Sequence, residues 1–246
     1  MLDRTDQTAD VSAVLPLRQS TGGSGSFLVA ADDGKRYWCK PLNNQQGPRV
    51  PITEQIVARF GALIGVAVCE PQLVLLDGIV GYEFRAGRFV EPGWAHGSLA
   101  VQPVLETRAL ENRSDDDNRV RQAGFFALHD WLAGSDAQWL YDTSSDNMYF
   151  SHDHGFYLTG PNWTVDTLQQ ATAAEFSLGT DPGGLDAHEL QRLAENLEAL
   201  TGQELESSAS KIPLSWPVTD DELSAAVSFA DARREAVAAR IRALVP

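Results

Sequence analysis

The segment from Gly134 to Gly160, read as GSDAQWLYDTSSDNMYFSHDHGFYLTG, constrains the fold of this chain more than any other stretch. The preceding residues, 118–133, predict a helix that ends at a glycine, the residue that helices favour just past their C-terminus. Two runs of strand-forming residues, 138–141 and 148–150, enclose a polar turn at 142–147. This pattern predicts a β-hairpin that directly follows a helix.

Two aspartates border the predicted hairpin. Asp136 precedes its first strand, and Asp153 follows its second strand. Because antiparallel strands return the chain to where it left, we expect the hairpin to bring the two carboxylates together. The order of helix, acidic loop, hairpin and Asp-x-Gly is also the order in which kinase-type folds present a catalytic base and a metal-binding aspartate.

The residues after the hairpin resemble a known family. The segment 153–160, DHGFYLTG, is similar to the Asp-Phe-Gly segment of phosphatidylinositol-kinase-like enzymes and to the Asp-His-Gly of bacterial HipA-like kinases. The chain is identified as a divergent member of the HipA-like group. The resemblance implies an α+β, two-lobed protein-kinase-like fold, with a small antiparallel β-rich N-lobe and a mainly helical C-lobe. It also implies transfer of the γ-phosphoryl group of ATP, with Mg²⁺, typically to a protein Ser or Thr.

The residue that completes the metal site beside Asp153 can be placed in two ways, because the usual catalytic loop is Asp-x-x-x-x-Asn. If the hairpin sets the register, Asp136 is the catalytic base and Gln138 replaces the asparagine as a metal ligand. If spacing alone sets it, Asp142 and Asn147 fit the pattern, but too few residues then remain before Asp153 for a hairpin. We favour Asp136 and Gln138, which leaves the other two as turn residues.

A glycine-rich loop follows the first predicted strand. It consists of Gly22, Gly23, Ser24, Gly25 and Ser26. Glycines let the backbone approach a phosphate closely and point several N–H groups at it, so the loop is a candidate cover for nucleotide phosphates. It matches neither the kinase G-x-G-x-x-G nor a Walker motif, and a plain flexible connection is the alternative. Strands around it are expected at 14–18, 27–30, 36–40, 72–76 and 78–84.

Lys40 ends a predicted strand whose other members include Tyr, Trp and Cys, so its charge needs a partner. The next predicted helix, 53–64, carries Glu54 in its first turn. The resemblance implies that Lys40 holds the α- and β-phosphates of ATP and that Glu54 fixes its ammonium group. The alternative role for Glu54 is a favourable interaction with the helix dipole.

The resemblance also places the inter-lobe hinge at 101–103, where backbone groups of Val101 and Gln102 would face the adenine ring. The strongly polar segment 106–118 reads as a solvated linker. We therefore predict an N-lobe at 1–105 and a C-lobe at 106–246.

Composition limits the partners of the chain. With 246 residues, 43% of them hydrophobic, it can bury a sizeable core. A formal net charge of −15 argues against DNA or RNA, which need a basic groove, and against anionic membranes and hence a lipid substrate. No apolar run reaches the length of a membrane span or a signal peptide. Cys39 and Cys69 read as core residues in a reducing compartment, so the cytoplasm is expected.

Two histidine patterns offer other metal sites. His152 and His154 flank Asp153, and on a continuing strand they would share one face while Asp153 faced away. An oxygen-rich Mg²⁺ site at Asp153 fits better. His129 and Asp130 lie on a predicted helix, as in HD-type metal phosphohydrolases, but the chain has five histidines in all, and an amphipathic helix end is favoured.

Together these residues predict an ATP- and Mg²⁺-dependent kinase in which Asp136 is the base and Asp153, with Gln138, holds the metal. Three alternatives stay open: a pseudokinase that binds a nucleotide without turnover, an enzyme that transfers AMP on the same fold, and an acidic interaction module that binds no nucleotide. The identity of the protein substrate and the oligomeric state are left open.

Overall fold

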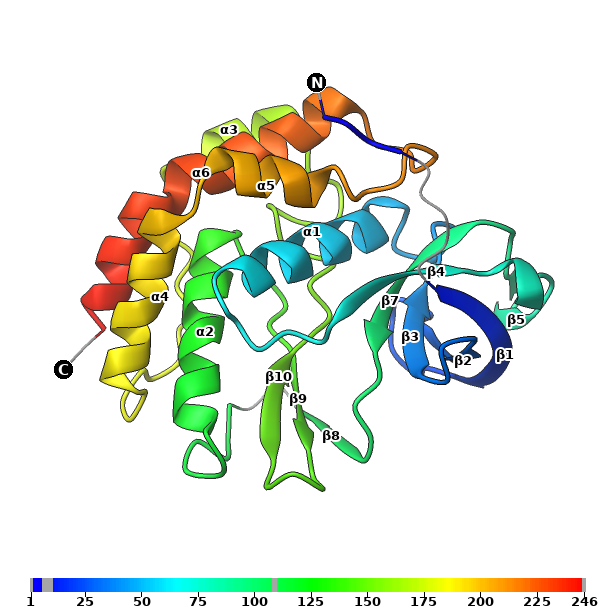
Figure 1. Cartoon of the computed structure of the whole chain (residues 1–246), viewed down its shortest axis with the longest axis horizontal. Coiled ribbons are helices and arrows are strands. Elements are labelled where there is room, and N and C mark those ends of the chain that lie inside the picture. The colour runs from blue at the N-terminus through cyan, green and yellow to red at the C-terminus, as the bar shows by residue number, and fades with distance from the viewer. Residues whose placement is uncertain (1, 6–10, 108–109, 245–246) are drawn as a thin grey trace.

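The computed structural model describes residues 2–5, 11–107 and 110–244 and combines a β-barrel with a layer of helices (Figure 1). The strands are β1 (Val11–Gln19), β2 (Phe27–Ala31), β3 (Arg36–Lys40), β4 (Pro71–Leu75), β5 (Glu83–Arg85), β6 (Arg88–Phe89), β7 (Trp94–Leu99), β8 (Val104–Thr107), β9 (Trp139–Asp142) and β10 (Met148–Ser151). The helices are α1 (Arg49–Leu63), the 3-10 turn η1 (Asp77–Ile79), α2 (Asn118–Trp131), α3 (Val165–Ala171), α4 (Ala187–Ala199), α5 (Gly202–Ala209) and α6 (Asp220–Arg242).

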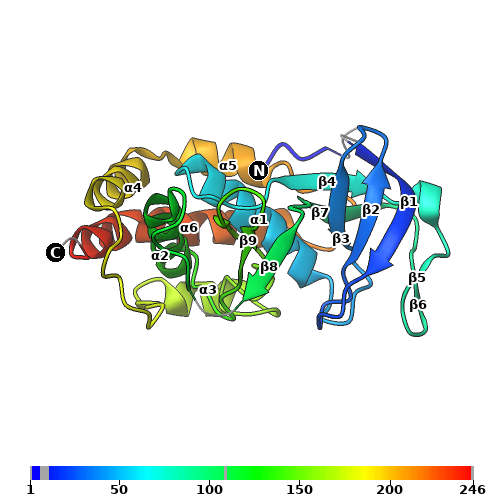
Figure 2. The same cartoon turned by 90° about the horizontal axis from the view of Figure 1, so that it is seen from below.

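Five strands close into a barrel in the order β1, β2, β3, β7, β4, with β1 and β4 parallel and the other neighbours antiparallel. Side chains that alternate inward fill the barrel, among them Phe27, Tyr37 and Cys39. Strands β5 and β6 pair separately beside the barrel (Figure 2). The outward-facing side chains of β3 lie outside the barrel core and can take part in a binding site.

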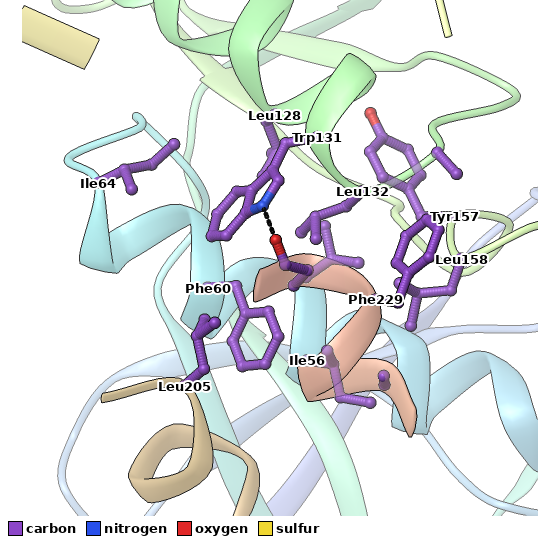
Figure 3. Close-up of a cluster of buried hydrophobic side chains, with 14 of the residues drawn as sticks. Ile56, Phe60, Ile64, Leu128, Trp131, Leu132, Tyr157, Leu158, Leu205 and Phe229 are labelled. Carbon is purple, nitrogen blue, oxygen red and sulfur yellow. Dashed lines mark hydrogen bonds between the residues drawn. The ribbon is translucent and has the colours of Figure 1, made fainter. Parts of the chain in front are cut away.

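Helix α1 is anchored to the helical layer rather than to the barrel alone. Figure 3 shows Ile56 and Phe60 of α1 among side chains from α2 and α6. The rings of Phe60 and Trp131 stack with centroids 6.1 Å apart, and Trp131 Nε1 donates a hydrogen bond to the Ala230 carbonyl at 2.8 Å. This contact is large and apolar, and the buried indole N–H of Trp131 has a hydrogen-bond partner. It therefore fixes α1 relative to α2 and α6.

The predicted hairpin is confirmed. Strands β9 and β10 pair antiparallel, with Trp139 opposite Ser151 and Asp142 opposite Met148. The hairpin packs against the helix before it, since Phe125 of α2 meets the Trp139 ring edge-on at 4.9 Å between centroids. Because helix and hairpin share an aromatic core, the two ends of the hairpin have a fixed position.

Two predicted elements differ from the structure. Helix α1 begins at Arg49 rather than at residue 53, because Pro51 lies in the first helical turn, where its missing N–H costs no hydrogen bond. The strand predicted at 78–84 was wrong over most of its length, which is a 3-10 turn and a loop before β5. A Cβ on Gly78 would lie 2.6 Å from the Ala13 carbonyl oxygen, so a glycine is needed there.

Strand β8 lies partly where the composition predicts a linker, and β6 and β7 were not predicted either. Glu106 and Thr107 opened the predicted linker, yet they belong to β8, which pairs antiparallel with β9 in a three-stranded sheet. Of that linker, 108 and 109 lie outside the described residues. The predicted boundary after residue 105 falls within β8, and the division into an N-lobe and a C-lobe stays a prediction.

Side-chain caps mark the starts of helices α4 and α6. The Asp186 side chain accepts a hydrogen bond from the Glu189 N–H at 2.9 Å at the start of α4. Thr219 and Glu222 cap α6 reciprocally. Within the described ranges, every helix is too short or too polar to span a membrane.

Candidate active site

A pocket opens between the outer face of the barrel and strands β8 and β9. Its empty volume, mouth included, is about 860 Å³. The predicted site residues on its wall are Gly22, Ser24, Ser26, Lys40, Glu54, Val101, Gln138 and Asp153. Those that do not line it are Gly23, Gly25, Gln102 and Asp136. Segments far apart in the sequence therefore meet at one cavity.

Lys40 lies at the centre of the charged end of this pocket. Its Nζ contacts a carboxylate oxygen of Glu54 and another of Asp153. Burial alone would lower the pKa of Lys40, but the negative charges of Asp153 and Glu54 outweigh it and raise that pKa. Burial works against the ionised form of Asp153, yet the charge and hydrogen bond of Lys40 hold the pKa of Asp153 below its ordinary range. The three groups therefore form one coupled ionic cluster.

Glu54 also holds the turn that follows β10. One carboxylate oxygen meets Lys40, and the other accepts a hydrogen bond from the His154 backbone N–H at 2.9 Å. Burial raises the pKa of Glu54, although Lys40 opposes this effect. A Cβ on Gly155 would lie 2.5 Å from Cγ1 of Val50, so only glycine lets the turn approach α1 this closely. Helix α1 and the Asp-His-Gly turn are thus joined at Glu54.

Asp136 and Gln138 lie at the start of the hairpin. Gln138 Nε2 donates to Asp136 Oδ2 at 3.2 Å, and the His152 N–H donates to the Gln138 carbonyl at 3.4 Å, which links the two ends of the hairpin. Asp136 and Asp153 both have left-handed backbones, with φ of 51° and 56°. Aspartate tolerates this region better than most residues.

The residues of the alternative register lie at the far turn of the hairpin. Asp142 accepts hydrogen bonds from the hydroxyls of Ser144 and Ser145 at 2.7 and 3.0 Å. Asn147 Nδ2 donates to Asp115 Oδ2 at 2.8 Å. Neither Asp142 nor Asn147 lines the pocket. Both act as turn residues in this structure.

The glycine-rich loop joins β1 to β2, and three of its residues line the same pocket as the charged cluster. The Ser20 N–H donates to the Ser26 carbonyl at 2.8 Å and closes the loop. Arg85 Nη1 donates to the Gly22 carbonyl at 2.6 Å from the neighbouring two-stranded sheet. Gly25, with φ of 67°, takes the left-handed backbone that favours glycine. The loop is therefore held in place at both ends.

The predicted hinge residues occupy different positions. Val101 lines the pocket. Gln102 does not line it, and its side-chain oxygen accepts a hydrogen bond from Arg36 Nη1 at 3.2 Å. Of the two, only Val101 contributes to the pocket wall.

The structure does not align His152 with His154. Strand β10 ends at Ser151, and the left-handed Asp153 breaks the alternation that would give the histidines a common face. His152 and Asp153 line the pocket, whereas His154 is buried with Nε2 2.7 Å from Ser151 Oγ. The arrangement in which both histidines share a face and Asp153 points away therefore does not form. His129 is also buried, and its Nδ1 lies 3.1 Å from the Phe176 carbonyl.

Within residues 2–5, 11–107 and 110–244, no three His, Cys, Asp or Glu side chains cluster in a way that could hold a metal ion. Mg²⁺ does not need such a cluster, because it commonly takes one or two protein oxygens together with substrate phosphates and water. Asp153 offers a carboxylate and Gln138 an amide oxygen on the same pocket wall. The donor set therefore fits Mg²⁺ held jointly with a nucleotide.

The sequence analysis did not assign several residues on the pocket wall to the site, among them Trp38, His96 and Glu106. Trp38 could have been found, because it lies two positions before Lys40 on a strand and so shares its face. His96 lies opposite Lys40 across the β3–β7 pairing, and Glu106 lies on β8. Both depend on strand pairings that local sequence does not encode.

The buried His154 should make the fold sensitive to acid. Burial lowers the pKa of His154 from 6.5 to about 3, so its contribution to stability is present above pH 6.5 and lost as pH falls toward 3. We expect the free energy of unfolding, without nucleotide or Mg²⁺, to fall by roughly 2 kcal/mol between pH 7 and pH 5 from this group alone.

Denaturant unfolding of His154→Gln at the two pH values checks this expectation. The variant should lose that part of the pH dependence, and His188→Gln, on the exposed face of α4, should keep it. An unchanged pH dependence in His154→Gln would contradict the assignment.

Comparisons with known proteins define the fold. No protein-family model matches the chain, and no curated protein matches its sequence. The crystal structure of the Helicobacter pylori proinflammatory kinase CtkA matches with a TM-score of 0.59 and 10% identity over 98% of both chains. The Golgi casein kinase matches with a TM-score of 0.52 and 10% identity, over 97% of this chain and 74% of that chain. Membership of the HipA-like group stays a prediction. The chain has a kinase-like fold.

Proposed function

We propose that this chain is an ATP- and Mg²⁺-dependent phosphotransferase of the HipA-like type, which phosphorylates a Ser or Thr hydroxyl of a protein. The observation that carries the proposal is the ionic cluster of Lys40, Glu54 and Asp153 at the end of a pocket. Holding a cation between two buried or half-buried carboxylates carries a desolvation cost, and groups perturbed in this way cluster at functional sites. The kinase-like fold supports the same conclusion.

Each residue has a defined role in this proposal. Lys40, oriented by Glu54, binds the α- and β-phosphates, and the loop Gly22–Ser26 covers them. Asp153 and Gln138 would hold Mg²⁺, which would neutralise charge on the phosphate oxygens. Asp136 accepts the proton of the acceptor hydroxyl, which must come within hydrogen-bond reach of its carboxylate.

One observation favours the alternative of a nucleotide-binding module without turnover. Asp136 does not line the pocket, and its carboxylate accepts a hydrogen bond from Gln138 Nε2. Because Asp136 lies off the pocket wall, either the acceptor hydroxyl must reach it or Asp136 must move before it can take the proton. The AMP-transfer variant would use the same pocket with ATP bound in the opposite direction.

Incubation of the wild-type chain with Mg²⁺ and ATP labelled at either the γ- or the α-phosphate separates these possibilities. With a mixture of Ser- and Thr-containing acceptor proteins present, the proposal requires label transfer from the γ position only. Transfer from the α position would indicate an AMP transferase. Nucleotide binding without any transfer would favour the module without turnover.

A further inference from the structure

Trp38 lies in the candidate active site without a role in the chemistry proposed above. On β3, Tyr37 and Cys39 point into the barrel core, so the alternation of the strand turns Trp38 and Lys40 outward together. Both side chains line the pocket. Successive same-face residues lie about 7 Å apart along a strand. The Trp38 indole therefore lies close to the Lys40 ammonium group, which would hold the phosphates.

The charge of the pocket wall changes along β3, from Lys40 to Trp38. Around Lys40 the wall is charged, with Glu54 and Asp153 in contact with it. On β7 the wall beside Trp38 is uncharged, because its partner in the β3–β7 register is Ser98 and the next residue is Leu99. Leu140 of β9 adds apolar surface to the same pocket. A nucleotide has this same division, with a flat apolar base at one end and phosphates at the other.

The Trp38 ring is held by its neighbours. Arg18, Leu28 and Trp38 form one row across β1, β2 and β3, as the strand registers show. The guanidinium of Arg18 lies over the Trp38 ring at 5.0 Å from its centroid, a cation–π contact. Leu28 between them is buried. A ring fixed in this way offers a preorganised surface and loses little freedom on binding.

We propose that Trp38 stacks on the purine base of the bound nucleotide and supplies the main affinity for the base, which rests on the proposed function of the pocket. An aromatic ring that stacks on a base contacts the π-face of the base and not its hydrogen-bonding edge. The contribution of Trp38 is therefore the same for adenine and guanine. Inorganic tripolyphosphate, which has no base, is bound without any contribution from Trp38.

Calorimetric titration of ATP, GTP and tripolyphosphate, each with Mg²⁺, into wild type and Trp38→Leu tests this proposal. Leucine keeps apolar bulk and removes the aromatic face. We expect Kd for ATP and GTP to rise roughly 10- to 100-fold and by the same factor, with tripolyphosphate changed less than about twofold. Trp38→Phe, which keeps an aromatic face, should recover most of the affinity, and Trp94→Phe outside the pocket should behave as wild type.

Two results would overturn the base site and leave the phosphate site intact. One is an unchanged ATP affinity in Trp38→Leu, and the other is an equal loss for ATP and tripolyphosphate, which would show a general structural role. A wild-type chain that binds neither ATP nor tripolyphosphate would instead overturn the proposed function, and the base site with it.

Discussion

Asp136→Asn should lower the rate of phosphoryl transfer by roughly 10²- to 10⁴-fold, the usual contribution of a general base. Asparagine keeps the volume of the side chain and an oxygen that can accept the Gln138 Nε2 hydrogen bond, so the local geometry should persist. Only the ability to accept a proton is lost. ATP affinity, measured by calorimetry, should therefore stay within about twofold of wild type, while the turnover rate falls.

Asp142→Asn is the matched control, because it is the same substitution on the same hairpin at the residue that the alternative register would make the base. It should leave the turnover rate unchanged, since Asp142 is held by turn serines away from the pocket. A large loss of rate in Asp142→Asn with normal rates in Asp136→Asn would contradict the register and move the base to the distal turn.

Lys40→Met should destabilise the fold by about 3 to 5 kcal/mol at pH 7, because it leaves Glu54 buried without its cation. The Glu54 residue is 2% exposed. Burial already raises the pKa of Glu54, and without Lys40 that pKa should rise further, so the variant should recover stability relative to wild type as pH falls from 7 to 5. Denaturant unfolding at both pH values measures the effect.

The double variant Lys40→Met with Glu54→Gln separates folding from function. Glutamine removes the unpaired charge and keeps an oxygen to accept the His154 N–H, so most of the lost stability should return. Phosphoryl transfer should not return, because the cation that binds the phosphates is still absent. A failure of Glu54→Gln to restore stability would mean that the Lys40 side chain matters through packing rather than charge.

The parts of the site that the sequence predicts are those with local signals. The hairpin is marked by two strand-forming runs around an Asp- and Asn-rich turn, and the outward position of Lys40 follows from alternation on β3. Glu54 is found because it lies in the first helix after that strand. In each case neighbouring residues determine the structure, so pattern and propensity are enough.

The parts that escaped prediction depend on contacts between distant segments. Strand β8 exists because it pairs with β9, although its polar sequence reads as a linker. His96 lies on the pocket wall because β7 pairs with β3 and places it opposite Lys40. Gly155 needs its small size because Val50, about a hundred residues earlier, packs against it. Tertiary packing decided all three positions.

Mg²⁺-dependent binding of ATP at Asp153 is the central claim, and thermal unfolding of wild type and Asp153→Asn with ATP, in the presence and absence of Mg²⁺, tests it most directly. A ligand that binds only the native state raises Tm, and at 100 times Kd the rise for a chain of this size should be about 5 to 10 °C. We expect wild type to show this rise only with Mg²⁺, and Asp153→Asn to lose it. No rise in wild type at millimolar ATP, with or without Mg²⁺, would contradict the account.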